Sequence, residues 1–156
     1  MPPPTATLAA PVALKLPAWE ALAAHAWAYP ALEAVHIVGI ALLLGSLVVF
    51  ELRVWGRQPS LAPDALARLA LPVSGVGFGL VVLSGSLMFA TQPAELIANR
   101  WFVAKIVLVS AAGLNAVAFH LRGGIARVDR WARVQTALSV GLWVGAIICG
   151  RWIAYA

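Results

Sequence analysis

Four long segments almost free of formal charge limit the fold of this chain more than any other feature. They are 17 to 26 residues long and contain a single charged side chain, Lys105. A membrane-spanning helix needs about 20 mostly apolar residues. Because the backbone in hydrocarbon must pair its own polar groups, such segments fold as helices. The four segments are 34–50, 69–94, 101–121 and 134–150. We therefore predict transmembrane helices over 31–53, 69–91, 101–122 and 133–154.

Composition supports a membrane protein and excludes several other classes. Hydrophobic residues make up 62% of the chain and charged residues 11%, whereas a soluble domain has about 25% charged residues. The net charge of +5 alone would suit nucleic acid, but the 11 Lys and Arg residues lie mostly at the ends of the apolar segments. That distribution is typical of a membrane protein, so we expect a lipid bilayer and no nucleic acid as partner. Cys149 is the single cysteine, which excludes a disulfide scaffold.

The expected fold class is all-α, an integral membrane four-helix up-down bundle over residues 31–156. Short connections make neighbouring helices antiparallel. Residues 1–30 form a separate region, because 1–17 contains five prolines and no periodicity and is expected to be extended. For 17–30 we predict a short interfacial helix with Trp19, Leu22 and Trp27 on one side. A simple extension of the first span is the alternative, and Pro30 favours a break.

The positive-inside rule predicts the orientation. The first and third connections hold seven arginines, and the opposite side holds three basic residues. We therefore expect those two connections in the cytoplasm and both termini outside. The seven are Arg53, Arg57, Arg68, Arg122, Arg127, Arg130 and Arg133, against Lys15, Arg100 and Arg151.

Two ionisable residues lie inside predicted spans at similar depth. His36 is about 9 Å along the first helix and Lys105 about 7.5 Å along the third, at 1.5 Å per residue. Both helices start on the outer side, and an ionisable residue within a span is costly and indicates a functional site. Two simpler interpretations stay open: Lys105 extends to the headgroups, or His36 is a neutral core histidine bonded to a carbonyl or to Glu33. Met88, near the outer end of the second helix, is a further soft ligand or a packing residue.

Other histidines and the glycines have simpler interpretations. His120 lies about 22 Å in depth from Lys105, so it cannot share one iron with His36, and we interpret it as interfacial. His25 is expected in the headgroup region. Gly75–Gly79 and Gly141–Gly145 have the four-residue spacing that lets helix backbones approach closely. They predict tight packing, self-association into a homo-oligomer, or room for a flat macrocycle.

The stretch from Tyr29 to His120 resembles a family of uncharacterised bacterial four-helix integral membrane proteins. The similar pieces are YPALEAVHIVGIALLLGS, ELRVWG, SGSLMF, NRWFVAK and GLNAVAFH. More distantly, the chain resembles the copper-resistance D membrane proteins and the haem-containing four-helix protoporphyrinogen oxidases. The second resemblance implies that His36 and Lys105 serve a haem. Length, N-terminal segment and loops differ from that group, so its oxidase activity is not carried over.

Together these observations predict a haem b-binding protein of the bacterial inner membrane that serves electron transfer or acts as an oxidoreductase, an oxidase-like enzyme being one version. His36 is the expected axial ligand, with Glu33 fixing its tautomer. Lys105 is either the opposite ligand, as a neutral amine, or the partner of a haem propionate, and Arg151 is a second candidate for a propionate. A quinone or an electron-transfer protein is the expected redox partner. A copper or other metal-handling protein and a non-catalytic scaffold subunit remain as alternatives.

Overall fold

The computed structural model describes residues 25–124 and 128–155, and all of their regular structure is helical. Four long helices are apolar and long enough to cross a membrane, which confirms the predicted all-α bundle of a multi-pass membrane protein. The interfacial helix predicted for 17–30 lies largely outside the described residues. The elements are α2 (Ala28–Val54), α3 (Pro63–Thr91), α4 (Pro93–Ala98), α5 (Arg100–Leu121), α6 (Arg130–Trp152) and the 3₁₀ helix η2 (Ile153–Tyr155).

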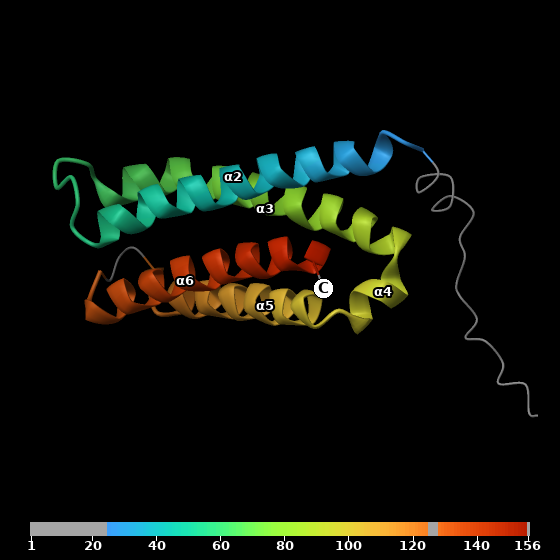
Figure 1. Cartoon of the computed structure of the whole chain (residues 1–156). Helices are drawn as coiled ribbons and strands as arrows, with labels where there is room; N and C mark the ends of the chain where they lie inside the picture. The colour runs from blue at the N-terminus through green and yellow to red at the C-terminus, as the bar shows by residue number, and fades with distance from the viewer. Residues whose placement is uncertain (1–24, 125–127, 156) are drawn as a thin grey trace, which may run out of the picture.

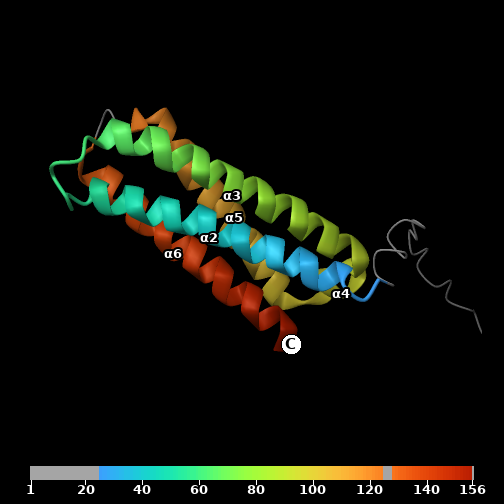
Figure 2. The ribbon, with the colours of Figure 1, turned by 90° about the horizontal axis from the view of Figure 1, so that it is seen from above.

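The bundle consists of two helical hairpins (Figure 1). The most extensive contacts join α2 to α3 and α5 to α6, and the hairpins meet mainly along α2 and α6. The long helices run alongside one another in both views, and α4 caps one end of the bundle (Figure 2). We refer to that end as the α4 end. The opposite end, where α2 and α5 finish, carries most of the arginines and is the arginine-rich end.

Prolines mark helix starts in this structure. α3 begins at Pro63, six residues before the predicted start, and α4 begins at Pro93 inside the predicted second connection. Pro30 lies in the first turn of α2, so it does not break that helix. In a first turn the missing N–H of proline has no partner to lose, and its fixed φ suits the helix.

Side-chain caps begin the two helices of the second hairpin. The Asn99 side chain accepts a hydrogen bond of 2.9 Å from the Trp101 backbone N–H at the start of α5. Asp129 accepts one of 2.8 Å from Ala132 N–H at the start of α6. Each cap satisfies a backbone donor that has no partner within the helix, and the two helices therefore start near their predicted positions.

The α2–α3 hairpin is held together at two glycines. A Cβ atom on Gly77 would lie 2.7 Å from the carbonyl oxygen of Gly39, and one on Gly39 would lie 2.9 Å from that of Gly77. Gly75 and Gly79, which have the spacing of a close-packing pair, face open space within the described chain. The backbones thus approach at Gly39 and Gly77, and the Gly75–Gly79 pair is left on another face of α3.

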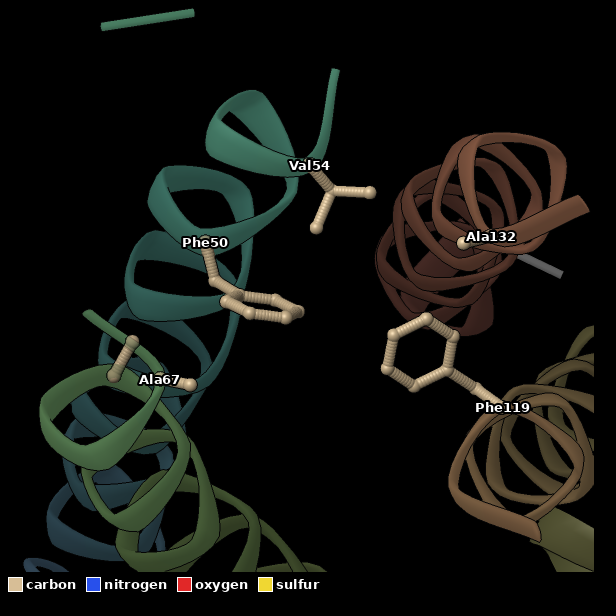
Figure 3. Packing of buried hydrophobic residues seen from close by; sticks show 6 residues of the cluster. Phe50, Val54, Ala67, Phe119 and Ala132 are labelled. Atoms are coloured by element: carbon tan, nitrogen blue, oxygen red, sulfur yellow. The ribbon is translucent and has the colours of Figure 1, made fainter. Parts of the chain in front are cut away.

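A hydrophobic cluster at the arginine-rich end takes residues from all four long helices. Phe50 of α2 and Phe119 of α5 meet edge to face, with ring centroids 6.4 Å apart (Figure 3). This geometry is favourable for aromatic pairs and joins the two hairpins. The cluster comprises Phe50, Val54, Ala67, Ala70, Phe119 and Ala132.

Candidate functional site

His36 is buried between α2 and α3, with 8% of its surface exposed. Its Nδ1 atom lies 2.9 Å from the hydroxyl oxygen of Ser84 on α3, and Ser84 is 1% exposed. The Ser84 hydroxyl donates its hydrogen to the carbonyl oxygen of Leu80, one turn earlier. A hydroxyl has one hydrogen to donate, so it must accept a hydrogen bond from Nδ1–H of the imidazole.

This hydrogen-bond network assigns the tautomer of His36. With the proton on Nδ1, the neutral ring carries a lone pair on Nε2. Nε2 is buried and has no hydrogen-bond partner within the described residues. An unsatisfied buried polar atom costs about 1–3 kcal/mol. The ring also interacts with the backbone of Val81, as in the simpler interpretation of a neutral core histidine bonded to a carbonyl, and Nε2 is the atom that this interpretation leaves without a partner.

Gly85 gives the imidazole its space on α3. A Cβ atom on Gly85 would lie 3.2 Å from Cε1 of His36, which is closer than ordinary carbon–carbon contact of about 3.5–4.0 Å. A glycine at position 85 therefore leaves room for the imidazole ring of His36 against α3. Ser84 and Gly85 together fix the position of His36 against α3.

Lys105 comes from the other hairpin and is half-buried. It extends along α6, where a Cβ atom on Gly150 would lie 3.6 Å from Lys105 Nζ. Its charge lies within electrostatic range of His36. No ion pair of Lys105 with an acidic group is found in the described part of the chain. The structure therefore brings His36 and Lys105 to the same region near the α4 end, each from a different hairpin.

The remaining predicted site residues lie around this pair at different distances. Glu33, one turn before His36, is exposed, and the position next to Nδ1 that we expected it to fill is occupied by Ser84. Met88 is half-buried one turn beyond Ser84, on the same side of α3. Arg151 is exposed at the end of α6, where its guanidinium donates to the Tyr155 hydroxyl and stacks on its ring.

The other two histidines lie away from the site. His120 is exposed at the end of α5, and its Nδ1 is 2.8 Å from the carbonyl oxygen of Ala116 in the same helix. It lies at the arginine-rich end, as the depth argument predicted. His25 is exposed just before α2.

The sequence analysis missed four buried polar residues, Glu51, Ser74, Ser84 and Thr136; Ser84 and Glu51 matter most here. Ser84 gave no signal, because an isolated serine in an apolar segment is common and its partner depends on the helix packing. Glu51 was taken only as the end of an apolar segment. Because α2 continues to Val54, the helix holds Glu51 inside the bundle at 1% exposure.

The functional proposal for this chain rests on the residues described above. Comparison with protein-family models, curated proteins and solved structures gives no match to this chain.

Proposed function

We propose that this protein binds haem b in the membrane and transfers electrons through it, with His36 Nε2 as an axial ligand of the iron. The observation that carries the proposal is the buried Nε2 atom that has no partner. Histidines that bind metals generally donate their other ring N–H to a second group, which fixes the tautomer. Ser84 has this relationship to His36.

The ligand set fits haem better than a bare metal ion. No cluster of three or more His, Cys, Asp or Glu side chains that could hold an ion is found in the described residues. A porphyrin supplies its own four nitrogen ligands, and the protein then adds one or two axial ligands, commonly histidine. Bound haem would supply a one-electron redox couple. The chain's own residues supply the imidazole, its orientation through Ser84 and the space beside Gly85.

Lys105 has two roles in this proposal. As a neutral amine it would be the second axial ligand, and as an ammonium group it would pair with a haem propionate. Its half-buried position and lack of an ion-pair partner in the described residues support a ligand or counterion of this kind. The two roles differ in what they do to the absorption spectrum.

The proposed location is the bacterial inner membrane, with both termini outside. Six of the seven arginines that support this orientation lie in described residues of the arginine-rich end. In this orientation the His36 site lies in the outer half of the membrane. A membrane quinone or an electron-transfer protein would exchange electrons with it, and Gly75 and Gly79 leave room on α3 for a second copy of the chain.

The test is an optical spectrum of the detergent-purified protein, produced with a supply of haem and recorded before and after dithionite. Wild type should show a Soret band that shifts on reduction, with haem in stoichiometric amount. His36→Ala should lose that haem, whereas His120→Ala should retain it, because His120 is exposed at the other end of the bundle. If wild type binds no haem, or if both variants retain it equally, the proposal is wrong.

A further inference from the structure

A second buried ionisable group lies deep in the bundle, toward the arginine-rich end. Glu51 on α2 is 1% exposed, and its Oε2 atom has no hydrogen-bond partner in the described chain. It is 15 residues after His36, so about 22 Å separates the two along the helix. Glu51 is therefore not part of the proposed haem site and needs its own explanation.

Polar side chains follow the line where α2 meets α6. The hydroxyl group of Ser139 lies beside the Glu51 carboxyl group and interacts with it. One turn further along α2, Trp55 Nε1 donates a hydrogen bond of 2.8 Å to the Thr136 hydroxyl. Thr136 is buried, whereas Trp55 is 39% exposed. We refer to Glu51, Trp55, Thr136 and Ser139 as the α2–α6 polar seam.

The charged groups on the surrounding helices are engaged elsewhere. On α2, Arg53 donates to the carbonyl oxygens of Leu61 and Pro59 in the loop. On α3, Arg68 pairs with Asp64. At the start of α6, Arg130 and Arg133 are exposed. At the end of α5, His120 is hydrogen-bonded to the carbonyl oxygen of Ala116. Arg122 donates hydrogen bonds to the side chains of Gln135 and Asp129. No ion pair of Glu51 is found in the described residues.

Within residues 25–124 and 128–155, the groups found around Glu51 are therefore the Ser139 hydroxyl group and apolar side chains of α2. Phe50 and Val54, on either side of it in α2, belong to the hydrophobic cluster. A buried carboxylate without a cation is very costly in such a medium. Adding one proton to the carboxylate gives a neutral carboxylic acid and removes that cost.

We propose that Glu51 is a proton-binding site in the interior of the bundle, which lies along the α2–α6 polar seam and exchanges its proton with solvent at the arginine-rich end. Oε2 is the oxygen that carries the proton, and the Ser139 hydroxyl is the polar group beside the carboxyl group. The only chemical step is reversible protonation, in which a carboxylate and a proton become a carboxylic acid. The proposal does not depend on haem, because it involves residues about four turns of α2 away from His36.

These residues are less suited to binding a metal cation than to binding a proton. Hard cations such as Ca²⁺ and Mg²⁺ take six or more oxygen ligands. Here one carboxyl group and the Ser139 hydroxyl are available, because the Thr136 hydroxyl already donates to carbonyl oxygens of its own helix and accepts from Trp55. A proton needs one oxygen atom.

Infrared spectroscopy of the purified protein tests the proposal, because the C=O stretch of a protonated carboxylic acid is separate from the carboxylate bands. At neutral pH wild type should show this band, and it should shift in D₂O, which demonstrates exchange. Glu51→Gln should lack it, and Glu51→Asp should restore it. Glu95→Gln is the matched control, because Glu95 is exposed, and it should retain the band.

A second variant keeps the test decisive if Glu51→Gln does not fold. Ser139→Ala removes the hydroxyl group beside the carboxyl group and should move the band to higher frequency while its area stays constant. An unmoved band in that variant, or no acid band in wild type, overturns the proposal. Loss of the wild-type band on adding sodium, but not choline, would assign the site to a metal cation and would also overturn it.

Discussion

Nδ1 of His36 and the hydroxyl oxygen of Ser84 lie 2.9 Å apart across the α2–α3 interface, and this contact decides which nitrogen of the ring remains free. Because Ser84 donates its only hydrogen to Leu80, it can only accept from Nδ1–H. The lone pair of Nε2 is then left without a partner within the described residues.

Ser84→Ala should weaken haem binding without removing it. The axial nitrogen remains, but the tautomer and the orientation of the ring are no longer fixed. Loss of such a supporting group costs about 10- to 100-fold in metal affinity. Haem titration of the apoprotein, followed by the Soret band, measures the change.

Ser74→Ala is the matched control for Ser84→Ala. Ser74 is also a buried serine of α3, and its hydroxyl donates to the carbonyl oxygen of Leu43 on α2. Ser74→Ala should leave haem affinity unchanged. Equal affinities in the two variants would show that Ser84 does not position the ligand.

Lys105→Met separates the two roles proposed for the lysine. If Lys105 binds iron, the Soret band and the reduction potential should both shift, since the axial ligands tune the electronics of the iron. If it pairs with a propionate, haem should dissociate faster while the spectrum stays the same. Arg100→Met, which removes an exposed cation one turn earlier, should change neither. A Lys105 variant that is unchanged in spectrum, potential and retention would remove this residue from the site.

Gly77→Ala should destabilise the protein, because its Cβ would lie 2.7 Å from the carbonyl oxygen of Gly39. Overpacking costs about 1–3 kcal/mol, which exceeds the roughly 1 kcal/mol that alanine gains over glycine in a helix. Gly75→Ala is the control, since open space surrounds Gly75 within the described chain, and it should be neutral or stabilising. Thermal unfolding in one detergent compares the two, and equal midpoints would contradict the assigned crossing.

Cysteine labelling tests the orientation. Ser60 lies in the exposed α2–α3 loop, and Glu95 is exposed on α4 at the other end. In intact cells Ser60→Cys should resist a membrane-impermeant thiol reagent, whereas Glu95→Cys should react, because the arginine-rich end is expected inside. The opposite pattern would place the His36 site in the inner half of the membrane. Native Cys149 is buried, and the unmodified protein serves as the background.

The long helices were predictable because a bilayer leaves few alternatives to apolar helices. The start of α3 and the short α4 were missed because Pro63 and Pro93 were taken as loop residues, whereas each occupies the first position of a helix. Spacing in the sequence also favoured the pair Gly75–Gly79. The close approach uses Gly77, because the face that a helix turns to its neighbour depends on the packing of the whole hairpin.

The candidate site was only partly predictable for the same reason. His36 and Lys105 were found because ionisable groups in an apolar segment stand out. Glu33 was expected beside His36 from its position one turn away, but the ring is directed to Ser84, 48 residues later in the chain. Glu51 was taken only as the charged residue that ends the uncharged segment 34–50, although the predicted span 31–53 and α2 itself both continue past it.

The crossing at Gly39 and Gly77 has a consequence for the chemistry of the imidazole. Sliding or tilting α3 there would displace Ser84, which follows Gly77 by seven residues, or about two helical turns. The hydrogen bond that selects the tautomer is therefore an outcome of backbone-to-backbone contact. If the proposed haem is bound, Gly77→Ala should accordingly change its absorption spectrum, although the substitution adds only one methyl group, about 10 Å along the helix from Ser84.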